Sequence, residues 1–376
     1  MNPFNSPHLC SRNWFVGLLV LITAVILYFG LNPKDFHFIN NVNRISDTPG
    51  IRFGDYSIAY TEPFLNNSPQ SLSDSYSIEI SLKPSLSQEP GQKFILLFYN
   101  GDADSQLLLT QYRTWLIMMN GDDYAHKRKT KRISMNMESF GHEPIYLTIT
   151  TGANGTKLYA NGALAAEKKD LRLQVPSDGN SRLILGNSAH GGHYWQGVIY
   201  SLGLYAYELD AGTILRHYRL WKPSREYAFA EKSSPHAFYL LDRIEQAKSH
   251  DASGNGNHLI IPSQLIFLEN EMLSWRMDGV RFAKGFILDT ALNLTGFVPF
   301  GMVLSVLLIG FNRSGRGKAI VISVLAGFSL SLFIEILQAW MPSRTSSAPD
   351  LILNTLGAFI GAYLISCFIP RHRASV

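Results

Sequence analysis

The sequence predicts a membrane protein with two kinds of domain: an α-helical transmembrane bundle of four spans and an all-β sandwich. Four apolar segments are each long enough to cross the roughly 30 Å hydrocarbon core of a bilayer. Between the first and the second lies a long region of short alternating runs separated by turn residues. Charged residues make up 16% of the 376 residues, which is low against about 25% in typical soluble proteins.

The first apolar segment runs from Trp14 to Leu31 and follows Arg12. At about 1.5 Å per residue, its length just spans a bilayer core. A cleaved signal peptide is the competing interpretation. No small-x-small cleavage pattern follows Phe29, where the chain reads Asn32-Pro33-Lys34 instead. An uncleaved anchor is therefore favoured.

Residues 45–262 have the pattern of an all-β domain. Residues 77–82 alternate between polar and apolar side chains with a period of two, which is typical of a half-buried strand. Asn-Gly pairs at 100–101, 120–121 and 161–162 stand between apolar runs, and such pairs favour tight hairpins. Many short strands with these turns indicate a sandwich or a barrel. No helix of convincing length is expected in this region before Ala211.

Three further spans follow a mixed connector at residues 263–284. The connector is either an ordinary linker or an amphipathic segment at the membrane surface. The spans are predicted at 286–309, 319–340 and 351–369, and Pro299 predicts a kink in the first of them. The expected domains are an N-terminus with the first span (1–44), the sandwich (45–262), the connector (263–284), the C-terminal helices (285–370) and a tail (371–376).

Basic residues set the expected orientation. Arg12, the 313–318 loop and the 371–376 tail carry the positive charge next to the spans, and positive flanks stay in the cytoplasm. Four crossings with both ends inside satisfy all three sites. Residues 45–284 and 341–350 are then extracytoplasmic. The basic flank of residues 276–284 would lie outside, as long exported domains permit.

Composition excludes several classes of function. A net charge of +4 is too small to indicate a nucleic-acid partner. The two cysteines, Cys10 and Cys367, flank apolar segments, so neither a disulfide framework nor a cysteine metal site is expected. No nucleophile–base set, phosphate loop or nucleotide fingerprint is found, and no cofactor is predicted.

Several pieces of the β region resemble the laminin-G/concanavalin-A-like family. Residues 145–150, 157–162, 183–187 and 195–209 match, in that order, its central strand and hairpin, next strand and closing strand. The resemblance implies a jelly-roll sandwich of two antiparallel sheets. Residues 238–257 look like the opening segment of such a domain but come last. Either this strand completes a permuted sandwich or it is part of a second copy; completion is favoured, because the remaining length holds no second sandwich.

The C-terminal segments resemble the VanZ-like membrane family. The resemblance rests on glycines at 296, 301, 357 and 361 and on a spaced polar set: Asp289, Asn293, Glu335, Gln338, Arg344, Asp350 and Asn354. It implies a multi-pass protein of the bacterial cytoplasmic (inner) membrane, with the sandwich inserted after the first span. Members of the family are associated with reduced sensitivity to glycopeptide antibiotics such as teicoplanin.

The predicted spans put the polar set at one depth. Asp289 and Asn293 are four residues apart and so share a helix face, as do Asp350 and Asn354; Glu335 and Gln338 are three apart. All can therefore meet near the outer leaflet, below Arg344. These groups either cross-link the helices or form a pocket for a lipid head group or a lipid-linked wall precursor. The pocket is favoured, because packing rarely demands three carboxylates at one depth.

Three stretches of the sandwich are weaker candidates. His190, His193, Tyr194 and Trp195 form either a sugar-stacking rim or part of the core. Asp251, Asn255 and Asn257 offer oxygen ligands for Ca²⁺ but also suit a simple turn. The basic stretch at 126–132 is either a solvated strand edge or an anion contact.

Three functions follow from these features. The first is a cell-envelope protein whose exported sandwich binds a glycan or another ligand and whose helices hold a polar site. The second is a membrane enzyme that acts on a lipid-linked envelope precursor. The third is a structural anchor for the sandwich. The expected partners are membrane lipid and either cell-wall glycan or a lipid-linked precursor.

Overall fold

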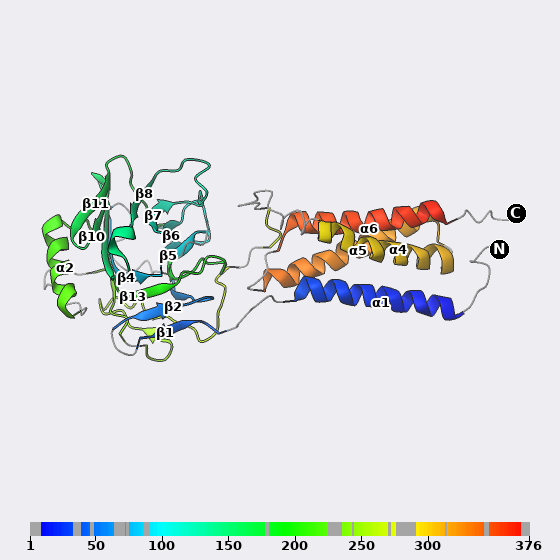
Figure 1. Cartoon of the computed structure of the whole chain (residues 1–376), viewed down its shortest axis with the longest axis horizontal. Coiled ribbons are helices and arrows are strands. Elements are labelled where there is room, and N and C mark those ends of the chain that lie inside the picture. The colour runs from blue at the N-terminus through cyan, green and yellow to red at the C-terminus, as the bar shows by residue number, and fades with distance from the viewer. Residues whose placement is uncertain are drawn as a thin grey trace. The chain divides into compact units, whose positions relative to one another are not determined.

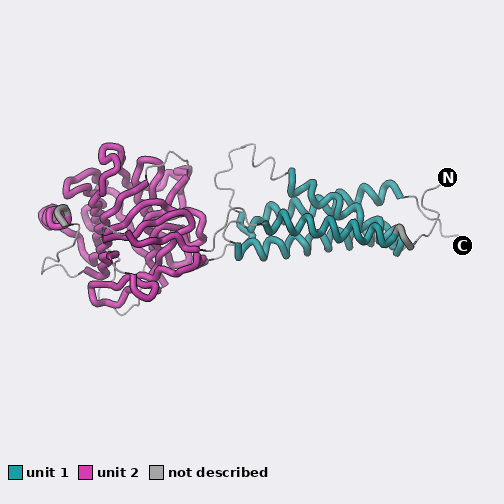
Figure 2. The backbone as a smooth tube through the Cα atoms, turned by 60° about the horizontal axis from the view of Figure 1, so that its bottom comes forward, with its two compact units in different colours: residues 1–36, 270–376 teal, residues 37–269 magenta. Residues whose placement is uncertain are grey.

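The computed structural model describes residues 9–32, 39–45, 49–63, 72, 75–85, 91–176, 180–224, 235–242, 244–269, 272–275, 291–312, 314–341 and 346–369. The chain divides into two compact units (Figure 2). One comprises residues 1–36 and 270–376, and the other comprises residues 37–269. The first unit is helical and the second is built mainly of β-strands (Figure 1).

The β unit is a sandwich of two antiparallel sheets. The first sheet has the order β1-β2-β13-β4-β9-β10-β11, with β14 also paired to β13. Its strands are Val42–Arg44 (β1), Ile51–Phe53 (β2), Gly197–Tyr205 (β13), Tyr76–Pro84 (β4), Ile145–Gly152 (β9), Gly155–Ala160 (β10), Ala163–Lys168 (β11) and Ala237–Tyr239 (β14).

The second sheet has the order β15-β16-β3-β12-β5-β6-β7-β8. Its strands are Lys248–Ser249 (β15), Leu259–Ile260 (β16), Ala59–Thr61 (β3), Arg182–Leu185 (β12), Lys93–Tyr99 (β5), Leu107–Tyr112 (β6), Trp115–Asn120 (β7) and Arg132–Asn136 (β8). A short 3₁₀ helix, Glu138–Phe140, follows β8. The all-β sandwich predicted from the alternating runs is confirmed.

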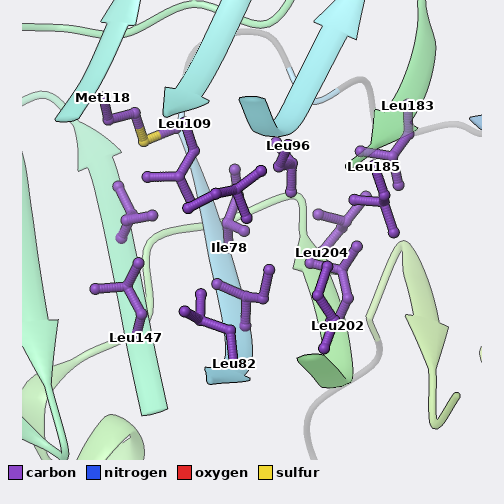
Figure 3. Close-up of a cluster of buried hydrophobic side chains, with 14 of the residues drawn as sticks. Ile78, Leu82, Leu96, Leu109, Met118, Leu147, Leu183, Leu185, Leu202 and Leu204 are labelled. Carbon is purple, nitrogen blue, oxygen red and sulfur yellow. The ribbon is translucent and has the colours of Figure 1, made fainter. Parts of the chain in front are cut away.

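The core lies between the two sheets (Figure 3). Ile78, Ile80 and Leu82 alternate along β4 and are at most 1% exposed. They belong to one buried cluster with side chains of the facing sheet, including Leu96 and Leu109. A strand with one core face needs apolar residues at every second position, which is why the period-two pattern located β4.

The late strands complete the sandwich rather than beginning a second one. β14 pairs with residues 202–204 of β13, on the edge whose residues 197–199 pair with β2. β16 pairs with β3, and β15 extends the sheet beyond it. The completion expected for residues 238–241 is therefore confirmed.

One of the three Asn-Gly pairs forms a tight hairpin. Asn161 and Gly162 join β10 to β11 with positive φ angles of 52° and 80°. The pair at 100–101 opens a longer connection between β5 and β6, and the pair at 120–121 opens the loop to β8. The expectation of a tight hairpin is thus right at 161–162 and wrong at the other two positions. There the next strand begins several residues after the pair, at Leu107 and at Arg132.

The helical unit contains four candidate membrane spans, within the residues described: Arg12–Leu31, Ala291–Phe311, Arg316–Ala339 and Ala348–Phe368. Its elements are α1 (Leu9–Leu31), a helical stretch at 291–296, α4 (Val298–Val306), the π-helical η2 (Leu307–Phe311), α5 (Arg316–Ala339) and α6 (Ala348–Phe368). Pro299 lies in the first turn of α4, and the helix is interrupted at Phe297. The chain is a multi-pass membrane protein with these four spans.

Helices of this unit that follow one another in the chain alternate in direction. The Phe15 ring near the start of α1 lies 6.0 Å from that of Phe311 at the end of η2. Arg316, at the start of α5, donates to the carbonyl of Ile369 at the end of α6. Gln338, at the opposite end of α5, donates to the carbonyl of Gly30 near the end of α1 (2.8 Å). The start of α1, the end of η2, the start of α5 and the end of α6 therefore lie at one end of the unit, which includes Arg316. The end of α1, the end of α5 and the start of α6 lie at the other end.

Small residues let α4 and α6 approach closely. A Cβ on Gly361 would lie 2.1 Å from the Val298 carbonyl oxygen, and one on Gly301 would lie 2.1 Å from the Ala358 carbonyl oxygen. Such contacts are feasible only for glycine. The close packing predicted from Gly357 and Gly361 is confirmed.

Candidate functional site

Five of the seven predicted membrane residues fall in the described part of the chain: Asn293, Glu335, Gln338, Asp350 and Asn354. Asp289 and Arg344 lie outside the described residues. The site is therefore built from the ends of α5 and α6.

Glu335 is a carboxylate that is almost completely buried within the helical unit. It lies one turn before the end of α5 and is 1% exposed. Its Oε2 accepts the backbone N–H of Ser347 at 2.6 Å, and the Ser346 side chain also hydrogen bonds to it. Ser347 is the N-cap residue of α6, where unpaired N–H groups and the helix dipole favour a negative charge. Backbone dipoles therefore offset part of the cost of burying this acid.

Part of the predicted connector lies beside this carboxylate. The N–H of Leu273 donates to Ser346 Oγ at 3.0 Å. Ser274 forms a parallel bridge with Ser347, with Ser274 N–H donating to the Ser346 carbonyl (2.9 Å). Residues 273–274 thus fix the same two serines that hydrogen bond to Glu335.

The exposed aromatic residues fit a membrane boundary at this end. Trp275 in the connector and Trp340 after α5 lie at this end, and both are 71% exposed. Trp14, near the start of α1 at the opposite end, is 62% exposed. Tryptophan is enriched at both membrane–water interfaces. The indole of Trp275 favours the interfacial interpretation of the connector over that of an ordinary linker.

Gln338 and Asn354 link helices rather than joining the Glu335 carboxylate. Gln338 bonds to α1 at Gly30, as described above. Asn354 Nδ2 donates to Ser331 Oγ at 2.9 Å, one turn along α5 from Glu335. Its Oδ1 is buried without a hydrogen-bond partner. Asn293 is half-buried. The geometry thus separates one anionic position at Glu335 from amides that join α5 to α1 and to α6.

Asp350 belongs to the same end of the bundle. It lies in the first turn of α6, where its N–H donates to Ser347 Oγ at 3.3 Å. Its charge acts on Glu335. Two acids therefore occupy adjoining helix ends in the described part of the site.

The four aromatic and histidine candidates of the sandwich have separate surroundings. His190 Nδ1 lies 3.2 Å from the Glu269 carbonyl oxygen, where the chain leaves the sandwich. His193 stacks on Phe94 with ring centroids 4.3 Å apart. Trp195 is 1% exposed and packs in the core, so it offers no open face for stacking. Of the four, Tyr194 and Trp195 line a pocket.

This pocket has a volume of about 230 Å³ and lies where loops from both sheets meet. Its deepest polar group is the Gln111 side chain, which is 2% exposed. Gln111 Oε1 accepts the Trp195 indole N–H at 2.7 Å. Its Nε2 donates to the carbonyls of Ser85 and Arg113, each at 2.9 Å. The floor is therefore satisfied and fixed before any ligand arrives.

Charged and aromatic groups surround the mouth of the pocket. Lys93 Nζ lies 4.6 Å from the centroid of the Tyr194 ring. Asp55 Oδ1 accepts from Gln196 Nε2 at 2.6 Å. Arg113 is exposed and adopts a φ of 55° in the turn between β6 and β7. Sequence reasoning missed Asp55, Lys93, Gln111 and Arg113, because they come from separate strands and loops and no local pattern links them.

The weak calcium candidates form a turn. Asp251 Oδ1 accepts the N–H groups of Phe238 and Ser253, and its Oδ2 accepts that of Asn257. The amide of Asn255 donates to the His236 carbonyl at 3.0 Å. The carboxylate thus binds β14 to the turn that follows β15 through backbone hydrogen bonds. In the described ranges, no group of three or more His, Cys, Asp or Glu could hold a metal ion.

The basic stretch at 126–132 lies at the edge strand of the second sheet. Arg128 pairs with Asp122, Lys131 with Asp170 at 2.8 Å, and Arg132 with Asp123 at 3.9 Å. Burial raises the pKa of Asp123, but hydrogen bonds from Thr130 and Arg128 outweigh it and hold that pKa below its usual value. These contacts support the strand-edge interpretation.

Glu79 lies beneath helix α2 (Ala211–Ser224) on the outer face of the first sheet. Its Oε2 lies 2.9 Å from His217 Nδ1, and its Oε1 accepts from Thr148 Oγ1 at 3.3 Å. Glu79 and His217 are 2% and 1% exposed. This pair attaches α2 to the sheet.

Two family profiles match the chain. Residues 237–369 match VanZ/LLP1, and residues 61–215 match the concanavalin A-like lectin/glucanases superfamily. The two resemblances derived from the sequence are confirmed. The VanZ/LLP1 match begins at β14, so it includes the strands that complete the sandwich. No curated protein matches the chain.

Solved structures similar to the sandwich include receptor-binding domains of botulinum neurotoxins. That of the C/D mosaic serotype is 19% identical, with 49% of this chain and 45% of that chain covered and a TM-score of 0.38. The serotype D binding domain is 18% identical, with 50% and 45% covered and a TM-score of 0.36. The chain spans less than half the length of these structures.

Proposed function

We propose that this chain, with its VanZ-like helices and concanavalin A-like sandwich, is a multi-pass protein of the bacterial cytoplasmic membrane that lowers sensitivity to glycopeptide antibiotics such as teicoplanin. The sandwich is exported and binds a glycan or another envelope ligand. The helices hold a polar site at the outer leaflet that binds a lipid head group or a lipid-linked wall precursor.

The observation that supports the membrane site is the buried carboxylate of Glu335. Glu335 is held at a helix end by the backbone N–H of Ser347 and the side chain of Ser346, which are neutral donors rather than a base. Asp350 adds a second acid rather than a neutralising base. Such a site suits a cationic or hydrogen-bond-donating head group, because two adjoining acids at a helix end attract both.

The test compares antibiotic sensitivity in cells carrying the chain or an empty vector. We expect the chain to raise the inhibitory concentration of teicoplanin, and Glu335→Gln or Asp289→Asn to abolish the increase at an unchanged level of membrane protein. Glu167→Gln, an isosteric change at an exposed position of β11, is the matched control. If both site variants keep the increase, the acids serve packing alone; if the chain itself has no effect, the antibiotic role is wrong.

A membrane enzyme acting on a lipid-linked envelope precursor is the second candidate. The proximity of two acids, Glu335 and Asp350, favours it, since a proton donor and a proton acceptor could occupy adjoining helix ends. Conversion of such a precursor by the purified chain, lost in Glu335→Gln while precursor binding is kept, would support the enzyme. Binding without conversion would favour the first function.

A further inference from the structure

We propose that the pocket at the rim of the sandwich binds an anionic saccharide unit, that is, one sugar ring carrying a carboxylate, sulfate or phosphate. This inference rests on the proposed function in taking the sandwich as the exported ligand-binding part. It assigns the binding to residues around Gln111 rather than to a histidine–aromatic rim.

The first argument is that the site is built in advance. Both N–H groups of the buried Gln111 amide donate, to the carbonyls of Ser85 and Arg113, and its oxygen accepts from the Trp195 indole. A Cβ on Gly197 would lie 2.3 Å from the Trp195 ring, so a side chain there would displace the indole. A fixed floor lowers the entropy cost of binding, because few groups must be ordered when the ligand enters.

The second argument is the charge at the mouth. Lys93 and Arg113 both line the pocket. Within the described residues, no ion pair joins either of them to a carboxylate, in contrast to Arg128, Lys131 and Arg132 of the basic stretch. A cation without a carboxylate partner beside a concave surface favours an anionic ligand, and an arginine fork fits carboxylate, sulfate and phosphate oxygens.

The third argument is the mixture of the remaining groups. The Asp55 carboxylate, which accepts from Gln196 Nε2, offers oxygen acceptors beside the two cations, and these suit hydroxyl groups on the same ligand. The Tyr194 ring adds an apolar wall. A volume of about 230 Å³ is below the roughly 300–1,000 Å³ of sites for drug-sized ligands, and so fits one ring. Hydroxyls, an apolar face and an anionic group together describe an acidic sugar.

The binding test uses the full chain in detergent and three acidic probes: trigalacturonate for carboxylate, glucose 6-sulfate for sulfate, and glucose 6-phosphate for phosphate. The neutral partner of the first is its methyl ester, which has the same sugar without the charge. Poly-glutamate separates an acidic sugar from an acidic peptide. We expect at least one acidic sugar to bind, with the methyl ester about tenfold weaker or more if the group is a carboxylate.

The variant Lys93→Gln/Arg113→Asn removes both cations from the pocket. Asparagine tolerates the positive φ of position 113, so the turn is kept. We expect its affinity for the acidic sugar to fall about tenfold or more, while Lys169→Gln, which removes an exposed charge beyond β11, stays within twofold.

Three results would overturn the inference: no binding of any acidic sugar at millimolar concentration, equal binding of poly-glutamate, or binding that the double variant leaves unchanged. None of them affects the antibiotic test, because that test changes Glu335 and measures the inhibitory concentration of teicoplanin rather than sugar binding. Loss of the teicoplanin effect in Glu335→Gln with normal sugar binding would in turn leave the pocket intact.

Discussion

At the scale of single residues, Glu79 and Glu335, the two most deeply buried carboxylates of the described residues, have different kinds of partner. Glu79 meets a side chain, the imidazole of His217, at 2.9 Å. Glu335 meets the N-terminal backbone of α6 through Ser347. The first arrangement joins a helix to a sheet and leaves no role for a ligand. The second leaves the carboxylate at a helix end beside another acid, which is the arrangement expected of a binding site.

The Glu79–His217 pair gives a prediction for stability. His217→Ala should destabilise the sandwich by about 3–5 kcal/mol, because the buried Glu79 carboxylate loses the imidazole beside it. The double change Glu79→Leu/His217→Leu should cost much less, since it removes the charge as well. Unfolding of the full chain in urea, followed by circular dichroism, measures both, with Arg219→Ala on the exposed face of α2 as control. Equal losses in the single and double variants would contradict the role of the pair.

At the scale of elements, local sequence patterns predicted those strands and helices whose burial depends on their own residue spacing. The period-two run at 77–82 marked β4, since its alternate residues meet the core. Glu335 was identified as a candidate site residue because a carboxylate within an apolar segment is costly. β15 and β16 have two residues each, and β16 is attached to the sheet through the distant β3, so no local pattern identified them. The pocket was missed for a related reason, because the pairing of β5 with β6 places Lys93 opposite Gln111, and segments distant in sequence supply the remaining lining.

Helix packing between α4 and α6 gives the second prediction. Gly361→Ala places a methyl group where the Val298 carbonyl oxygen would lie 2.1 Å away, so the helices must separate. We expect a lower thermal midpoint in detergent and less folded protein in membranes. Gly317→Ala in α5 is the matched control, because nothing lies within 4 Å of its new Cβ and alanine favours a helix by roughly 1 kcal/mol. Equal thermal midpoints and equal amounts of folded protein for the two variants would show that the fold does not depend on the close approach of α4 and α6.

At the scale of the whole molecule, the membrane topology of the chain determines which side of the membrane each site faces and therefore which ligands it can bind. The start of α5 and the end of α6 lie at one end of the helical unit, joined by Arg316 and Ile369. Glu335 and the N-terminus of α6 lie at the other end, with the exposed Trp340. The positive charge of Arg12, Arg316 and Lys318 would keep the first end in the cytoplasm. Glu335 would then face the exterior, on the same side of the membrane as the sandwich.

Labelling from outside intact cells tests this threading. In a background with Cys10 and Cys367 changed to serine, we expect a membrane-impermeant maleimide to label Lys127→Cys in the sandwich and Met341→Cys after α5. Ser314→Cys, before α5, should react only after permeabilisation, because it adjoins the cationic end. The opposite result would put Glu335 at the cytoplasmic face. Its carboxylate could then not meet a precursor at the outer leaflet, and a glycopeptide outside the cell would be beyond its reach.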